Sequence, residues 1–227
     1  MSLVLPHGLG REWSQEEKKA FMDLFAREAS HPSEQPPERW NGPGVVEVAL
    51  FVGELAEAPA EVLCTSTNPK LSLLGGTGAA VIAGAGWGVR QEALEIVQRA
   101  QATAGLAGLE IGTVHRTSAG RLPHALLLHC VASGPGRAVS PEAIRSCVRG
   151  ALAEADRAGC SAVAMPVFGA GHASFPFDRA VRAIGEELSS ASTAVQRVVL
   201  VIFDGDHVTR VRQVLDEVLP RSGAPGR

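Results

Sequence analysis

The chain has 227 residues, of which 45% are apolar and 20% are charged, and its formal net charge is −3. This composition excludes a disordered tail or a polyelectrolyte, and the slight negative charge gives no reason to expect nucleic acid or an anionic membrane as a partner. No run approaches the roughly 18 apolar residues needed to span a bilayer, and the N-terminus lacks the residue order of a secretory signal. We therefore expect a cytoplasmic chain with a single α/β domain.

The first 44 residues differ from the rest. Ser14 followed by Glu17 is a capping-box pattern, and it predicts a helix near residues 14–29 with two phenylalanines on one apolar face. The helix could pack against the main domain or receive a partner, and we expect packing, because such a face is unfavourable in water. The four prolines of residues 31–44 predict an extended connector.

From residue 45 onward, apolar segments alternate with amphipathic ones. Strands are predicted at residues 45–52, 61–67, 111–117, 125–131, 161–167 and 197–203, and helices at 79–85, 89–104, 141–158, 177–189 and 208–219. The short connection 118–124 predicts an antiparallel pair, whereas the alternation with helices predicts a sheet covered on both faces. We therefore expect a three-layer α/β/α sandwich with a mixed central sheet of about six strands over residues 45–219. A loose tail is expected at 220–227.

The cysteines and histidines give no sign of a metal site. Neither a CxxC pair nor a paired His/Cys spacing occurs among Cys64, Cys130, Cys147 and Cys160, which we interpret as small buried hydrophobic residues in a reducing compartment. His129 lies in an apolar segment and is interpreted as a core histidine. No metal and no cofactor are expected.

Two glycine-containing loops follow predicted strands, and ligands of open α/β sheets bind beyond the carboxyl ends of strands. The loop at residues 74–78 opens a helix, so its amides and the helix dipole favour an oxyanion. The loop at residues 169–174 contains neither a carboxylate nor a large aliphatic side chain, and it predicts a backbone cradle for a diphosphate. Each loop taken alone is also compatible with a tight turn.

Five segments together resemble the macro domain family over roughly residues 45–219. Residues 52–55 resemble its Gly-Asp-Ile segment, and residues 64–68 resemble its Val-Asn-Ala-Ala-Asn strand end. Residues 75–78 resemble its glycine run, and residues 165–176 resemble its diphosphate loop. Residues 117–123, followed by His129, resemble its Thr-x-Gly-Tyr-x-Leu-Pro segment and the Ile-His strand after it. Members of the family bind ADP-ribose, and some hydrolyse ADP-ribosyl linkages or deacetylate O-acetyl-ADP-ribose. The resemblance implies ADP-ribose or a related nucleotide as ligand, and ADP-ribosylated proteins or metabolites as partners.

The resemblance also implies a set of site residues. Glu54 would accept the adenine amino group in place of the usual Asp, and Phe203 would form an adenine wall. Asn68 would bond the distal ribose. The residues that would line this ribose and the phosphates are Gly75, Gly76 and Gly78, and those that would hold the diphosphate are Gly169, Ala170, Gly171, His172 and Ala173, with Ser174 completing the loop.

This chain departs from the family pattern where hydrolases carry their chemistry. The Asp of the hydrolase subgroup is absent from residues 79–82, and no lysine lies between Gly75 and Gly88. Hydrolysis would have to rely on a phosphate-oriented water, on Asn68 or on His172. Binding is therefore favoured over ADP-ribosyl or O-acetyl-ADP-ribose hydrolysis.

A third hypothesis is a different nucleotide-binding α/β protein. It would use residues 84–88 as a dinucleotide turn, although this run follows a predicted helix rather than a strand. Trp87, within the run, could pack the loop or form a wall of the ligand site, and we interpret it as a packing residue.

Overall fold

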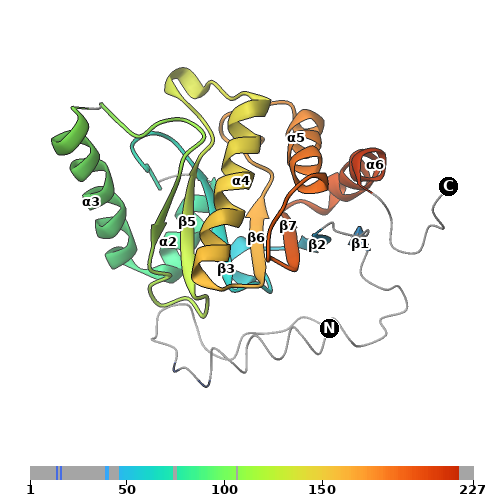
Figure 1. Ribbon diagram of the computed structural model, residues 1–227, viewed down its shortest axis with the longest axis horizontal. Helices are drawn as coiled ribbons and strands as arrows, with labels where there is room; N and C mark the ends of the chain where they lie inside the picture. The colour runs from blue at the N-terminus through green and yellow to red at the C-terminus, as the bar shows by residue number, and fades with distance from the viewer. Residues whose placement is uncertain are drawn as a thin grey trace.

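The computed structural model describes residues 14, 16, 39–40, 46–73, 76–105 and 107–219. The helix predicted near residues 14–29, apart from two of its residues, and the tail at 220–227 lie outside the described part of the chain. Within that part, a seven-stranded sheet carries helices on both faces (Figure 1). The predicted α/β/α sandwich is therefore confirmed.

The sheet is parallel in its centre and antiparallel at both edges. Its strands are β1 (Arg39–Trp40), β2 (Glu47–Val52), β3 (Val62–Thr67), β4 (Val114–Thr117), β5 (Leu126–Val131), β6 (Ala162–Pro166) and β7 (Arg197–Ile202). Their order is β1-β2-β7-β6-β3-β5-β4, in which the outer pairs β1–β2 and β4–β5 are antiparallel. The mixed sheet and the antiparallel pair predicted from the short connection are confirmed.

The helices lie close to where their apolar periodicity predicts them. They are α2 (Gly76–Ala85), α3 (Trp87–Ala104), α4 (Pro141–Ala158), α5 (Phe177–Ser189) and α6 (Val208–Val218), and the short 3-10 turns are η1 (Leu55–Glu57), η2 (Pro135–Arg137) and η3 (Gly205–His207). The side chain of Ser140 caps α4 by accepting a hydrogen bond from the Ala143 amide at 3.1 Å. Gly159 ends this helix in the left-handed conformation, with φ 68°.

One predicted strand is shorter than expected. The pattern of residues 111–117 predicts a strand, but β4 begins at Val114. Gly112 adopts φ 87° and its amide donates to the Val131 carbonyl at 2.8 Å, so a turn precedes the strand. Ile111 consequently lies in a loop, with 46% of its surface exposed.

Both faces of the sheet are apolar, because successive side chains of a strand point to opposite faces. Along β7, Val198 and Leu200 face the cluster formed with α4, α5 and α6, whereas Val199 and Val201 face α2 and η1. This two-sided burial is typical of parallel strands, and it holds the sheet between two layers of helices.

The four cysteines are free and buried, as predicted. Cys64, Cys130 and Cys147 lie between the sheet and α4, where burial raises the pKa of the Cys130 thiol well above its usual value. No helix in the described ranges is both long and apolar enough to cross a membrane.

The segment predicted as a plain connector contributes an edge strand. Trp40 of β1 is buried, and its indole Nε1 donates to the Asp216 Oδ1 at 2.9 Å. Asp216 belongs to α6, so this bond fixes the edge of the sheet to the last helix. Strand β1 therefore protects the edge of β2 from solvent.

A buried polar chain crosses three strands at the other side of the sheet. The His129 ring lies between Thr65 Oγ1, 3.2 Å from its Nδ1, and Thr117 Oγ1, 2.9 Å from its Nε2. A neutral imidazole satisfies both contacts, since it donates from one nitrogen and accepts at the other. Burial chiefly, and also the nearby His115, lower the pKa of His129 to about 4, against an opposing effect of Glu92. His129 is a core histidine, as predicted.

We expect this ring to make the stability of the protein depend on pH. The unfolded ring takes up a proton near pH 6.5, whereas the folded ring does so only near pH 4. Lowering the pH from 7 to 4 should therefore favour the unfolded state, with His129 reducing the free energy of unfolding by about 3 kcal/mol. Urea denaturation at each pH measures the effect.

The matched variants are His129→Gln and, as a control at an exposed position, His172→Gln. The first should flatten the pH dependence in this interval, and the second should leave it as in the parent chain. Equal pH dependence of the parent and His129→Gln would contradict the assignment.

Candidate functional site

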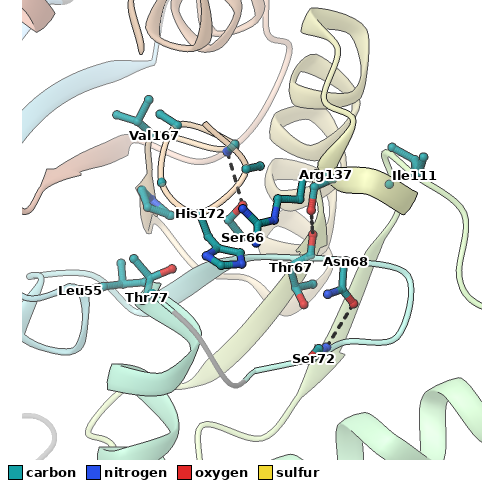
Figure 2. Close-up of a pocket in the computed structure, with 18 of the residues that line it drawn as sticks. Leu55, Ser66, Thr67, Asn68, Ser72, Thr77, Ile111, Arg137, Val167 and His172 are labelled. Carbon is teal, nitrogen blue, oxygen red and sulfur yellow. Dashed lines mark hydrogen bonds between the residues drawn. The ribbon is translucent and has the colours of Figure 1, made fainter. Parts of the chain in front are cut away.

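The carboxyl ends of five neighbouring strands, β2, β7, β6, β3 and β5, border one cavity of about 1710 Å³. These strands are parallel to one another, so the loops that follow them meet at the same edge of the sheet. The start of α2 and the loop before β4 complete the walls (Figure 2). The cavity thus lies where the sequence places its candidate loops.

Asn68, which follows β3, uses half of its side-chain amide to shape its own loop. Its Oδ1 accepts hydrogen bonds from the amides of Lys70 at 3.0 Å and Ser72 at 3.4 Å. These bonds close a turn in which Leu71 adopts φ 46°. Because Oδ1 is occupied, the Nδ2 group is the part of Asn68 that remains free to donate into the cavity (Figure 2).

The loop at residues 169–174 leaves successive backbone donors unused. Its first amide donates to Ser66 Oγ at 3.4 Å, and its last amide donates back to a carbonyl of the loop at 2.9 Å. The amides for which the described chain provides no acceptor are those of Gly171, His172 and Ala173. Consecutive free N–H groups at a cavity wall form a site suited to an oxyanion.

The two glycines of this loop have different structural roles. Gly169 adopts φ 76°, and a Cβ atom there would lie 2.7 Å from Val139 Cγ1, so the loop packs directly against the segment before α4. At Gly171 a Cβ atom would meet nothing within 4 Å. The fold therefore requires glycine at the first position and leaves space at the second.

Helix α2 brings a second set of donors to the cavity. Gly76 and Thr77 line the wall, and the first four amides of a helix have no acceptor within it. Residues 74–75 of the predicted loop lie outside the described residues. Gly78 does not line the cavity: a Cβ atom there would lie 3.2 Å from the Leu73 Cα, so this glycine permits a close approach of two segments.

Strained backbone is concentrated around the cavity. The described non-glycine residues with positive φ are Leu71 at 46°, Arg137 at 64° and Ser174 at 56°. Each lies in a loop that follows a central strand and lines the cavity. Such conformations cost on the order of 1–3 kcal/mol, and they persist where surrounding structure holds them, often at functional sites.

The two ends of the cavity differ in charge. Glu54 and Asp204 lie at the end formed by β2 and β7. Lys70 and Arg137 lie at the opposite end, beyond β3 and β5, together with Glu110. No described carboxylate forms an ion pair with either of these two cations, so both remain available to an anion.

The acidic end also presents aromatic side chains. Phe203 is 75% exposed, although large apolar side chains are usually buried. Nearby on the wall, the His207 ring lies 4.5 Å from the Phe177 ring, and its Nδ1 lies 3.7 Å from Asp204 Oδ2. A flat apolar group could therefore find aromatic contacts at this end.

The His172 ring points into the cavity without a partner that would orient it (Figure 2). No residue in the described part of the chain hydrogen-bonds either ring nitrogen. A catalytic base is normally held by such a partner. The catalytic role considered for His172 therefore stays a prediction, and the geometry adds nothing to it.

The structure brings most of the predicted site residues to one cavity. Those that line it are Glu54, Asn68, Gly76, Gly169, Ala170, Gly171, His172, Ala173 and Phe203. Ser174 and Gly78 do not line the cavity: Ser174 shapes its loop, and Gly78 supports α2. Sequence reasoning missed Arg137, although the preceding Gly-Pro-Gly run is a turn signal after a predicted strand.

The glycines of residues 84–88 take no part in the cavity: Gly84 belongs to α2, Gly88 belongs to α3, and Gly86 joins the two helices. A dinucleotide turn would need a strand before it, so the third hypothesis has no structural support. The interpretation of Trp87 as a packing residue is wrong. Its side chain is 60% exposed and stacks on Arg90, whose guanidinium carbon lies 4.5 Å from the ring centroid.

Comparison with known sequences identifies one matching family. The sequence pattern of the Macro domain matches residues 64–184 of this chain. An uncharacterized protein of Pyrobaculum aerophilum is 28% identical over 181 residues, which cover 78% of this chain and 95% of that protein. An uncharacterized protein of Mycobacterium tuberculosis is also 28% identical, but the match spans 47% of its length.

Comparison with solved structures gives the same fold. The Oceanobacillus iheyensis macrodomain with ADP matches with a TM-score of 0.66 and 20% identity, over 78% of this chain and 94% of that one. The macro domain of ganglioside induced differentiation associated protein 2 matches with a TM-score of 0.65 and 17% identity, over 77% of this chain and 85% of that one.

Two threonines on the same face of β3 allow a test of the site's polarity. Thr67 lines the cavity and is only 5% exposed, yet its Oγ1 has no hydrogen-bond partner in the described chain. Thr65 Oγ1 instead contacts His129. We expect Thr67→Val to raise the free energy of unfolding by about 1 kcal/mol and Thr65→Val to lower it by about 1–3 kcal/mol, because only the second leaves a buried group unpaired. Urea denaturation at pH 7 measures the free energy of unfolding of both variants. Equal losses of this free energy in Thr67→Val and Thr65→Val would contradict the assignment.

Proposed function

Because the chain belongs to the macro domain family, we propose that it binds ADP-ribose, free or attached to a protein or metabolite, in the cavity beyond the central strands. One observation carries the proposal: the three successive unused amides at residues 171–173. A diphosphate has several oxygen acceptors, and these three backbone amides can donate to them although they carry no net charge. That structures of the Oceanobacillus iheyensis macrodomain with ADP and with ADPR share this fold supports the choice of ligand.

The polarity of the cavity favours one orientation of the ligand. In our proposal, the adenine lies at the end formed by β2 and β7, where Glu54 accepts from its amino group and Phe203 contacts its ring. The diphosphate lies against the loop at residues 169–174. The distal ribose then reaches Asn68, beyond β3. This orientation keeps the phosphates away from Glu54 and places them towards the cationic end.

The role of Asn68 in this orientation is more specific than a general polar contact. Its Oδ1 is already bonded to two backbone amides, so Nδ2 donates to a ribose hydroxyl. The ribose then accepts a hydrogen bond from a group whose rotamer the turn fixes. Such preorganisation reduces the entropy lost on binding.

Hydrolysis of an ADP-ribosyl linkage or of O-acetyl-ADP-ribose is the alternative function. A water positioned between the ligand phosphates and Asn68 Nδ2 would be the nucleophile, and substrate phosphate would help to orient it. No described residue holds the His172 ring in place as a base. We therefore propose binding as the function and test hydrolysis separately.

Gly171→Glu tests the diphosphate loop. The position has open space and an unstrained backbone, so the fold should accept the side chain, while its carboxylate would repel the phosphates. We expect affinity for ADP-ribose, measured by calorimetry, to fall by more than about tenfold. Gly171→Gln, of similar size without charge, should lose less. Equal affinity of the parent chain and Gly171→Glu would show that the loop does not hold the diphosphate.

Asn68→Asp separates binding from hydrolysis. The substitution keeps an oxygen for the two backbone amides but replaces the Nδ2 donor. We expect weaker binding of ADP-ribose by about tenfold, consistent with loss of one donor in a preorganised site. Incubation of the parent chain with an ADP-ribosylated protein should leave the label in place. Release of ADP-ribose by the parent chain but not by Asn68→Asp would instead establish the enzyme.

A further inference from the structure

We infer that Arg137 is a specificity-determining residue of the site: its guanidinium binds the phosphate nearer the distal ribose and selects nucleoside diphosphates over monophosphates. The inference rests on the proposed function and assigns to this side chain a contact that backbone amides alone do not provide. Figure 2 shows the side chain extending from η2 into the cavity, towards Ser66 and His172.

The backbone around Arg137 is held in place before any ligand binds. The Gly134 amide donates to the Ala138 carbonyl at 2.7 Å, and the Arg137 amide donates to the Gly134 carbonyl at 3.1 Å. Arg137 itself adopts φ 64°, a conformation that a free chain would seldom keep. The turn thus aims an exposed arginine from a fixed base.

This turn contacts both elements that the proposal assigns to the ligand. Ser133, just before it, donates from its amide at 3.3 Å and from its Oγ at 3.2 Å to the Thr67 carbonyl at the end of β3. Val139, just after it, packs against Gly169 at the start of the diphosphate loop. Arg137 therefore lies between the segment that leads to Asn68 and the loop with free amides.

The charge of Arg137 is available to a ligand. Lys70 is the only other lysine or arginine among the described residues that line the cavity, and no described carboxylate pairs with either cation. A guanidinium presents parallel N–H donors that match two oxygens of one phosphate, which an ammonium cannot do. The amides supply dipoles, and Arg137 adds a full positive charge in a fork geometry that Lys70 cannot provide.

The position along the cavity predicts which phosphate is bound. Glu54 and Phe203 lie beyond β2 and β7, at the adenine end, whereas Arg137 follows β5 at the other end. The phosphate attached to adenosine is then nearer the middle of the cavity, and the second phosphate is nearer Arg137. Removal of the guanidinium should affect ligands that carry the second phosphate.

The test is a calorimetric comparison of ADP-ribose, ADP, AMP and adenosine with the parent chain, Arg137→Ala and Arg137→Lys. We expect Arg137→Ala to weaken ADP-ribose and ADP by about tenfold, AMP by less than about threefold, and adenosine not at all. Arg137→Lys should fall between the parent and alanine chains, since it keeps the charge without the fork. Affinity of the parent chain should also fall more steeply with salt than that of Arg137→Ala.

Arg99→Ala is the matched control, because it removes the same charge from an exposed position on α3, outside the cavity. It should leave all four affinities unchanged, and melting temperatures should be equal for every variant. If Arg137→Ala bound ADP-ribose as tightly as the parent chain, this inference would be overturned and the proposed function would stand. The same conclusion would follow if Arg137→Ala lost as much affinity for adenosine as for ADP-ribose. Failure of the parent chain to bind any of the four ligands would overturn the proposed function and the inference with it.

Discussion

The structure depends on the parallel pairing of five neighbouring strands, β2, β7, β6, β3 and β5. Parallel strands require crossover connections, and here the helices of those connections bury both faces of the sheet. The same pairing forces five strand ends to one edge. Loops that are separated by as many as a hundred residues therefore form one wall, as the bond from the Gly169 amide to Ser66 Oγ illustrates.

The cavity built in this way relies more on the backbone than on side chains. Successive amides of one loop and the first turn of α2 provide donors that depend little on residue identity. Such donors hold an anion well but do not transfer protons. His172 has no orienting partner in the described chain, so the described cavity offers anion donors rather than a held proton-transfer group.

Side chains give the cavity two chemically different ends. Acidic and aromatic groups lie at one end and the unpaired cations Lys70 and Arg137 at the other. This separation matches a ligand with an aromatic base at one end and phosphates further along. Asn68 illustrates how the cavity is preorganised, because hydrogen bonds to its own loop settle which half of its amide remains free to donate.

The sequence by itself determined the local features. Apolar periodicity located the strands and helices to within a few residues, because it reflects the geometry of each element alone, and the small residues marked the loops. The tertiary structure alone decided the long-range pairings. The indole of the buried Trp40 bonds Asp216, 176 positions away, and Val139, two residues after Arg137, lies against Gly169. These contacts join segments with no common periodicity, so they arise only when the sheet assembles.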